Sequence, residues 1–436
     1  MLAYYFNLAL RSFRRNRVLT ALMVLAIALG IGASMTTLTV FWVLSGDPVP
    51  GKSDRLFYVQ LDPRPADSYT PGDEPPRQLT RYDAEALLRE GRAQRQALMT
   101  GGNVNVEPER AGVDPYRADS RYTSADFFAM FDVPFQYGRA WDAGADERHE
   151  RVAVISSEMN EQIFGGGDNT GRTIQLDRNT FRVVGILDEY RPVPKFYDLN
   201  ASSGYGAVEQ VFMPFTASRD LDLARSGSMD CFRARDPGQK DTDIGAGCVW
   251  IQYWAELDST ADAADYRQYL VNYSAQQRTA GRYEREPNVQ LRNLMGWLDF
   301  NQVLPSDVRL QMWLALGFLL VCLLNTVGLL LAKFLRRSSE IGVRRALGAS
   351  RRAVFTQCLV EAGTVGLAGG VLGLGLAALG LWAVRQQSTD YADLAQLDPT
   401  MLLVTFALAL LSSLLAGMLP AWRACQIAPA IQLKSQ

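Results

Sequence analysis

The sequence predicts a membrane α-helical protein with four transmembrane helices and a large α+β extracytoplasmic domain between helices 1 and 2. The first observation is that long apolar stretches are concentrated at the two ends of the chain, although the mean hydropathy is only −0.05. The second is that four of these stretches reach the roughly 20 apolar residues that a helix needs to cross a bilayer. The third is that the largely polar residues 45–306 are ample for an independent hydrophobic core.

The N-terminal segment, residues 1–17, is followed by a charge-free apolar stretch that predicts transmembrane helix 1 over residues 18–44. Four arginines stand in the segment, so the two together could be taken for a secretory signal peptide. The apolar region of a signal peptide is only about 7–15 residues long. Because this stretch is much longer, we favour a retained anchor over a cleaved signal peptide.

Residues 45–306 form the predicted extracytoplasmic domain. Residues 177–179 predict a hairpin turn between two β-rich runs, and Ser124 and Ser157 are plausible N-caps of short helices. The stretch 218–247, rich in Asp, Arg, Gly and Ser, predicts a long loop or an insertion. The predicted strands are 151–156, 173–176 and 180–186, and the predicted helices are 124–131, 157–164 and 261–278. This mixture indicates an α+β domain.

Three further apolar stretches complete the membrane part. Transmembrane helices 2, 3 and 4 are predicted over 307–332, 354–385 and 400–420, with connecting loops at 333–353 and 386–399 and a tail at 421–436. Lys and Arg near helix ends mark the cytoplasmic side. The 333–353 loop carries seven basic residues against Glu340 alone, whereas the 386–399 loop carries three aspartates and no base. Both termini and the 333–353 loop are therefore expected in the cytoplasm, with the 386–399 loop and residues 45–306 on the outer side of the membrane.

Composition argues against several classes of function. The single histidine, His149, leaves almost no material for a histidine-based triad or a multi-histidine metal site. The five cysteines contain no CxxC pair, and the net charge of −2 argues against a nucleic-acid binder. No GxxxxGK[ST] phosphate loop occurs, and Gly165–Gly167 are better explained as a helix stop followed by a loop. We therefore expect no catalytic residues, and no metal or cofactor bound by this chain.

Several blocks of the sequence resemble a known family, in the family's order. Residues 122–187 contain FFAMF, RVAVIS, IFGGG and FRVVGI, and resemble the periplasmic core domain of MacB-type permeases. Residues 340–350, EIGVRRALGAS, resemble the most recognisable cytoplasmic motif of the FtsX-like permease domain. Residues 357–373 resemble the helix that follows, and GMLPAWRACQIAPAIQLKS resembles the usual ending. The departures are the absence of a fused nucleotide-binding domain and the CQIA run at 425–428.

The resemblance implies a permease of an ABC transporter (type VII superfamily) in the inner membrane, paired with a second copy or a paralogue. A separate ABC ATPase subunit would bind ATP–Mg, a periplasmic adaptor is a further partner that the resemblance allows, and no nucleic acid is implied. The leading function is efflux or mechanotransmission, in which ATP hydrolysis moves the outer domain. The alternative is lipoprotein extraction or control of a cell-wall hydrolase by the same mechanism. A third class, a membrane-anchored periplasmic enzyme, has no recognisable nucleophile–base pair in the sequence.

The segment 338–355 is the candidate for the ATPase contact. It contains a charged and an apolar set of residues, so it could form a short amphipathic helix that lies in a groove of a partner. The alternative is a basic helix that lies on anionic lipid headgroups; the resemblance favours the ATPase. The docking residues are Glu340, Ile341, Val343, Arg344, Arg345, Ala346 and Leu347, with Arg351 and Arg352 extending the charged set.

Helix 3 carries an acid and a set of glycines. Glu361 lies inside an apolar stretch, where an acid is costly and suggests a function by default. The plainer interpretations are that Glu361 pairs with a nearby arginine or that the helix begins later. The glycines Gly366/Gly370 and Gly369/Gly373 form two GxxxG pairs, a spacing that lets helices approach closely. Their partner is expected within the subunit or at a dimer interface.

Two cysteines lie in the polar middle of the chain. Cys231 and Cys248 are outside by the predicted topology, where disulfides persist. They are 17 residues apart and bracket most of the predicted loop. Closing a loop of this size contributes about 3 kcal/mol in the chain-entropy model. We predict that they are bonded to each other.

Overall fold

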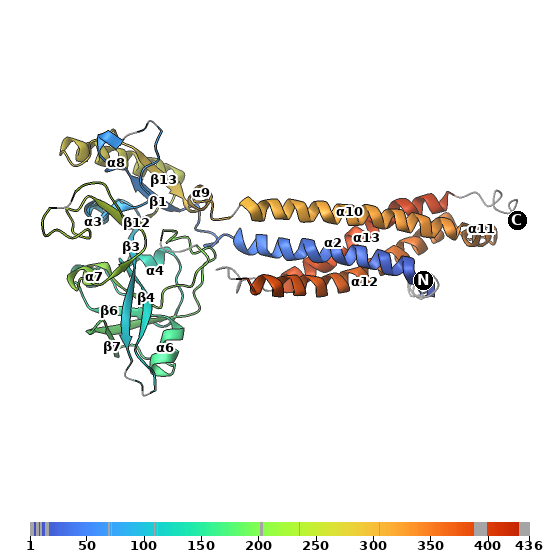
Figure 1. Cartoon of the computed structure of the whole chain (residues 1–436), viewed down its shortest axis with the longest axis horizontal. Helices are drawn as coiled ribbons and strands as arrows, with labels where there is room; N and C mark the ends of the chain where they lie inside the picture. Colours follow the sequence, from blue (N-terminus) through green and yellow to red (C-terminus); the bar gives the residue numbers. More distant parts are fainter. Residues whose placement is uncertain are drawn as a thin grey trace. The chain divides into compact units, whose positions relative to one another are not determined.

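The structure is a computed structural model that describes residues 4–5, 8, 11–13, 17–68, 70, 72–108, 110, 112–200, 204–234, 236–304, 306–387 and 399–426. The chain divides into two compact units, one of residues 1–45 with 304–436 and one of residues 46–303. The first unit is helical, and the second contains the strands (Figure 1). Most of the predicted 386–399 loop and the tail beyond residue 426 lie outside the described residues.

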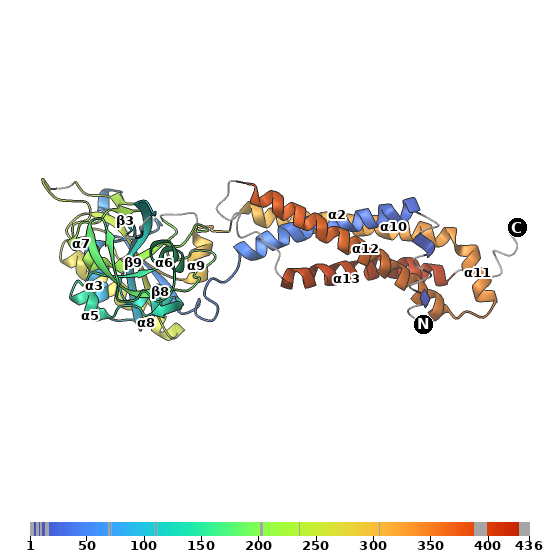
Figure 2. The ribbon, with the colours of Figure 1, turned by 90° about the horizontal axis from the view of Figure 1, so that it is seen from below.

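Four long helices form the first unit and lie side by side (Figures 1 and 2). They are α2 (Arg17–Leu44), α10 (Ser306–Arg336), α12 (Arg351–Arg385) and α13 (Pro399–Cys425), with the short α11 (Ser338–Ala346) between α10 and α12. All four contain a segment long and apolar enough to cross a membrane. The four membrane helices predicted from the sequence are therefore confirmed.

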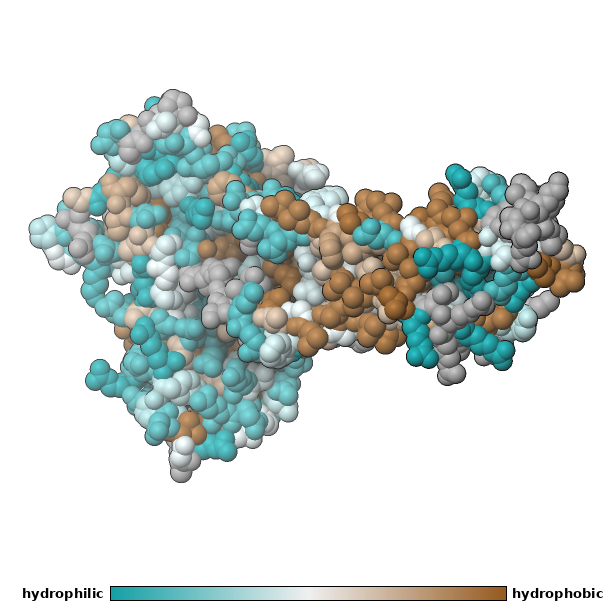
Figure 3. All heavy atoms as spheres, turned by 45° about the vertical axis from the view of Figure 1, so that its right-hand side comes forward, coloured by the Kyte–Doolittle hydropathy of each residue, from teal (hydrophilic) through white to brown (hydrophobic). Residues whose placement is uncertain are grey.

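The surface of this helical unit is apolar. Figure 3 shows hydrophobic residues gathered over the long helices, whereas hydrophilic residues cover most of the visible face of the other unit. Leu310, Leu314 and Leu324 of α10 each expose 59–63% of their surface. An exposed apolar surface of this extent is expected where lipid, not water, surrounds a protein.

The end of α10 differs from the prediction. The helix continues four residues past the expected end at 332, to Arg336. Lys333, which we expected in a cytoplasmic loop, is 1% exposed and lies inside the bundle. Its ammonium group lies 2.7 Å from a carboxylate oxygen of Glu361 on α12. Because this acid neutralises the charge, Lys333 can be buried and the helix can continue past it.

A mixed β-sheet organises the second unit. Among the described residues it has thirteen strands, and its main path runs β13-β1-β12-β3-β4-β9-β6-β8-β5. The strands are β1 (Leu56–Leu61), β2 (Leu79–Thr80), β3 (Arg95–Glu107), β4 (Tyr116–Thr123), β5 (Phe135–Gly138), β6 (Val152–Ile155), β7 (Thr173–Leu176), β8 (Asn179–Leu187), β9 (Val211–Pro214), β10 (Arg225–Ser226), β11 (Asp230–Cys231), β12 (Cys248–Glu256) and β13 (Val289–Asn293). Two pairs, β4–β9 and β6–β8, are parallel and the others are antiparallel.

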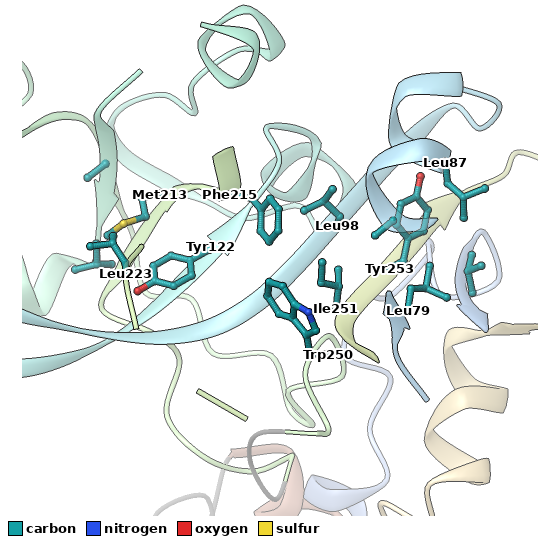
Figure 4. Packing of buried hydrophobic residues seen from close by; sticks show 14 of the residues in the cluster. Leu79, Leu87, Leu98, Tyr122, Met213, Phe215, Leu223, Trp250, Ile251 and Tyr253 are labelled. Atoms are coloured by element: carbon teal, nitrogen blue, oxygen red, sulfur yellow. The ribbon is translucent and has the colours of Figure 1, made fainter. Parts of the chain in front are cut away.

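Helices pack around this sheet. They are α3 (Arg81–Glu90), α4 (Asp126–Met130), α5 (Ala143–Glu147), α6 (Ser157–Phe164), α7 (Phe215–Asp220), α8 (Thr260–Thr279), α9 (Leu294–Phe300) and the 3-10 turn η1 (Ala66–Ser68). β12 is buried along its whole length. Figure 4 shows Trp250 of β12 close to Phe215 and Leu98 in the hydrophobic core. The α+β class predicted for this domain is confirmed.

The strands predicted in the middle of the chain correspond to β6, β7 and β8. The turn between β7 and β8 consists of Asp177 and Arg178 alone, and Asn179 already belongs to β8. Both turn residues have positive φ, 46° and 61°. Two central residues with positive φ match the right-handed twist of a hairpin.

The predicted N-caps were placed wrongly. α6 begins at Ser157, but Ser156 caps it by accepting a hydrogen bond from the Met159 backbone N–H at 3.1 Å. Ser124 caps nothing, because its hydroxyl donates to the Gln96 carbonyl at 3.3 Å and α4 starts without a side-chain cap. α8 is one residue longer at each end than the predicted helix 261–278.

The segment predicted as a loop, 218–247, contains the end of α7 and the short strands β10 and β11. Cys231 is the register partner of Cys248, across the β11–β12 pair. The structure joins their sulfur atoms in a disulfide, with the two Cα atoms 4.0 Å apart. The bond closes the loop between the two strands.

Candidate functional site

α11 is the candidate site, because it is the short element between two membrane helices where the sequence places its most distinctive block. It has nine residues. An isolated helix shorter than about 12 residues is marginal in water. Its contacts with the long helices must therefore hold it in shape.

The apolar residues of α11 do not all lie on one side. Ile341 is half-buried and packs against the hydrophobic core of the bundle. Val343 and Leu347 are 53% and 83% exposed, and Ala346 is exposed beside them. Ile341 was predicted as a docking residue, and the structure places this side chain against the bundle, where it holds α11. Val343 and Ala346, with Leu347 directly after the last residue of α11, form what we call the exposed face of α11.

The charged residues of α11 contact the bundle. The Arg344 guanidinium donates to the side-chain oxygen of Gln357 on α12 at 3.0 Å. It also lies 3.5 Å from the Glu340 carboxylate, one turn earlier. Arg345 donates to the backbone carbonyl of Cys425, at the end of α13, at 3.1 Å. These arginines therefore bind α11 to α12 and α13, whereas the exposed face stays open.

Glu361 is buried, with 3% of its surface exposed, ten residues after the start of α12. Its carboxylate lies 2.7 Å from Lys333 Nζ and 3.2 Å from Arg337 Nη1. Ser12 donates its hydroxyl to the same carboxylate at 2.5 Å. The helix does not begin later than predicted, so the pairing interpretation is the one that the structure supports. We call these four residues the Glu361 cluster.

The Glu361 cluster joins several segments. Lys333 also donates to the Thr20 hydroxyl of α2 at 3.4 Å, and Arg337 donates to the Glu340 carboxylate at 3.3 Å. The cavity beside Glu361, lined also by Arg337 and Gln357, has a volume of about 20 Å³. This volume suits one water molecule. It does not suit an organic substrate.

Sequence reasoning offered a nearby arginine as a partner of Glu361, which fits Arg337, but it missed Lys333 and Ser12. Lys333 was counted as a loop charge, and Ser12 was not considered. One signal was available: Lys333 and Arg337 stand four residues apart, a spacing that places two side chains on one side of a helix. An intramembrane acid elsewhere in the chain is the obvious counter-ion for such a pair.

The glycines of α12 pack within the chain. A Cβ atom at Gly366 would lie 2.0 Å from Ser413 Oγ, and one at Gly370 would lie 2.7 Å from Ala409 Cβ, both on α13. A Cβ at Gly369 would lie 2.6 Å from Ile27 Cγ2 on α2. A Cβ at Gly373 would also approach α2, at 3.1 Å from Ile31 Cβ. Each GxxxG pair thus packs against one neighbouring helix. Of the two expected partners, the structure shows helices of the same subunit.

The second unit has a buried ionic cluster that the sequence did not reveal. Arg121 contacts Asp198 at 2.6 Å and also Glu209, and Lys195 lies 3.2 Å from Glu209. Burial alone would raise the pKa of Glu209, but the nearby Arg121 and Lys195 charges lower it to about 2. The charges of two acids and two bases cancel in this cluster. We therefore interpret it as part of the domain core and not as a functional site.

Two family models match the chain. The MacB-like periplasmic core domain matches residues 20–273, and the FtsX-like permease C-terminal domain matches residues 312–429. The first match covers more than half of the 436 residues.

Curated relatives match almost the whole chain. The macrolide export ATP-binding/permease protein MacB of Rhodospirillum rubrum is 26% identical over 99% of this chain and 60% of that protein. The pyoverdine export ATP-binding/permease protein PvdT of Pseudomonas aeruginosa is 23% identical over 97% of this chain and 57% of that protein. The chain thus spans about three fifths of the length of the curated relatives it matches.

Solved structures also match. The periplasmic region of MacB from Actinobacillus actinomycetemcomitans aligns with 56% of this chain and 92% of that chain, at 12% identity and a TM-score of 0.35. The extracellular domain of the ABC-type transporter YknZ from Gram-positive bacteria aligns with 54% and 99%, at 11% identity and a TM-score of 0.35.

Proposed function

Because the chain belongs to the MacB-type family of ABC transporter permeases, we propose that ATP hydrolysis by an ATPase docked on α11 drives a conformational change of its periplasmic domain. The chain is a multi-pass membrane protein. We place it in the inner membrane, with α11 in the cytoplasm. It would act as a dimer with a second permease copy or a paralogue.

The observation that carries this proposal is the exposed face of α11. Leu347, at 83%, is the most exposed of the large apolar residues that the structure describes. Apolar side chains on a short helix are the usual anchors of a helix that lies in the groove of a partner. A helix lying on lipid headgroups would instead use its arginines on the lipid, yet Arg344 and Arg345 are bound to Gln357 and to the Cys425 carbonyl.

The names of the relatives support export as the purpose of the movement. The curated relatives are exporters of macrolides and pyoverdine by name. Within the described bundle, the buried polar centre beside α11 is the closed Glu361 cluster, whose cavity is too small for such molecules. We therefore propose that the substrate is handled by the periplasmic domain or in the outer leaflet, and that the four helices transmit movement.

The docking proposal is tested by replacing its central anchor. Leu347→Asp should lower the amount of ATPase that co-purifies with the chain from detergent at least about tenfold, since truncating a central anchor costs 2 kcal/mol or more. Leu335→Asp is the matched control: Leu335 is 51% exposed on the last turn of α10, outside the exposed face of α11. It should leave the ATPase yield unchanged.

An undiminished ATPase yield with Leu347→Asp would overturn the assignment and return α11 to the lipid surface. An equal loss with both variants would show a general effect of a new acid near the membrane, and would also count against specific docking. Insertion of each variant is checked by its yield in the membrane fraction.

A further inference from the structure

Glu361 is the sole buried acid in the described parts of the four membrane helices; the other acid, Asp307, is exposed at the opposite end of α10. Donors from three separate segments meet at its carboxylate: Lys333 from α10, Arg337 from the junction with α11, and Ser12 from the N-terminal segment.

Arg337 connects this carboxylate to α11. It is the residue directly before α11, and its guanidinium contacts both Glu361 on α12 and Glu340 in the first turn of α11. The start of α11 is therefore attached to α12 through one guanidinium held between two acids. Charge-assisted contacts of this kind are about twice as strong as neutral ones.

Lys333 depends on the same acid. Its side chain is fully buried, and its remaining contacts are the Thr20 hydroxyl at 3.4 Å and the face of the Phe13 ring at 5.4 Å. A buried cation that loses its counter-ion is strongly destabilising, whereas an apolar pair of similar volume is tolerated. Glu361 thus holds α10 and α11 to α12 at one point.

We propose that Glu361 is the positioning residue that fixes α11 to α10 and α12, so that a displacement of α11 moves these helices with it. The purpose of this link, transmission of movement from a bound ATPase, rests on the proposed function. The link itself is independent of the proposed function. It can be measured on the purified full-length chain without any ATPase. Failure of docking at Leu347 and failure of the link are therefore separate results.

Amide hydrogen exchange of residues 338–346 measures the attachment directly. α11 has only nine residues, too few to be protected on its own, so its protection reports contact with the bundle. Stability of the bundle is followed separately, by the reaction of a maleimide dye with Cys322, Cys358 and Cys425 on heating. These three thiols are buried, and the other two cysteines are joined in the disulfide.

Two variants distinguish attachment from general stability. Glu361→Gln should make α11 exchange about tenfold faster, the effect of losing a charge-assisted contact, and should lower the temperature at which the thiols react. The double variant Lys333→Met, Glu361→Met removes both buried charges. It should restore the thiol-reaction temperature, because an apolar pair replaces the ion pair, while α11 still exchanges fast because Arg337 has lost its partner on α12.

Asp307→Asn is the matched control, the same acid-to-amide change at an exposed position of the bundle. It should change neither measurement. Unchanged exchange of α11 in Glu361→Gln would overturn the proposal. Recovery of slow exchange together with the thiol-reaction temperature in the double variant would also overturn it, since Glu361 would then stabilise the bundle without positioning α11.

Discussion

Asp146, in α5 of the periplasmic domain, is the residue whose titration should be visible in the stability of the protein. Its carboxylate accepts hydrogen bonds from the Ala125 backbone N–H at 2.8 Å and from the Trp141 indole at 2.9 Å. Burial outweighs these bonds and raises the pKa of Asp146 from 3.8 to about 6. The native state therefore keeps this proton at pH values where the unfolded chain has lost it.

The sign of the pH dependence follows from that difference. Between about pH 4 and 6 the native state binds more protons, so the free energy of unfolding should fall as pH rises, by roughly 2–3 kcal/mol in all. Asp146→Asn should flatten the pH dependence in this window. Calorimetric unfolding of the full chain in detergent at pH 4.5, 5.5, 6.5 and 7.5 checks it, and equal slopes in both proteins would place the titrating group elsewhere.

Single residues were predictable from the sequence where their surroundings were local. Glu361 stood out because an acid inside an apolar stretch is rare, and the pairing of Cys231 with Cys248 could be proposed from compartment and spacing. The spacing of Lys333 and Arg337 offered a signal for one partner, but Ser12 could not be found, because helix rotation and helix ends decide which side chains meet. The same applies to Arg121 of β4 and Glu209, which lies in the connection before β9.

At the level of elements, α12 depends on its glycines. At Gly366 an added methyl group would lie 2.2 Å from Ser413 Cβ as well as close to its hydroxyl. Gly366→Ala should therefore push α12 away from α13 and destabilise the bundle by about 1–3 kcal/mol, the usual cost of overpacking. The thiol-reaction temperature of the bundle should fall accordingly.

Gly375→Ala provides the control for this prediction. A Cβ atom at Gly375 meets nothing within 4 Å, so the substitution adds helix propensity worth up to about 1 kcal/mol without a clash. Its thiol-reaction temperature should be equal or higher. Equal temperatures for Gly366→Ala and the unsubstituted chain would show that α12 and α13 do not pack as closely as the structure has them.

Long elements were easier to predict than short ones. Hydropathy identified α2, α10, α12 and α13, since each satisfies a length requirement that few other segments meet. The amphipathic α11 was expected, yet which of its sides faces the bundle was not, because its sequence offers both Ile341 and Leu347 as apolar anchors. Contacts with α12 and α13 decide between them.

For the whole molecule, the remaining prediction is its orientation in the membrane. The bias of Lys and Arg predicts that the segment around Ser350 is cytoplasmic and the segment after Gln387 is periplasmic. An alkaline phosphatase fusion after Gln387 should be active and one after Ser350 inactive. Activity of the Ser350 fusion would reverse the orientation and remove α11 from the reach of a cytoplasmic ATPase.

The class of the fold could be predicted, but its strand order could not. β6, β7 and β8 are close in sequence and were expected. β1 pairs with β12 and β13, roughly 190 and 230 residues later in the chain, and no local pattern specifies such partners. These strands come from opposite ends of the domain sequence. No short turn connects them, so the sequence has no hairpin signal for their pairing.

The whole sheet domain separates α2 from the other helices of the bundle in the sequence, and this separation has a consequence for biosynthesis. α2 ends at Leu44, and α10, the next helix of the bundle, begins at Ser306. At about 5–20 residues per second, the ribosome needs roughly 13–52 s to reach α10, whose Leu319 and Cys322 pack on Gly30 of α2. During that time α2 stands alone in the bilayer with its packing face against lipid. The sheet domain, whose residues all lie in that interval, can fold before the bundle that anchors it is complete.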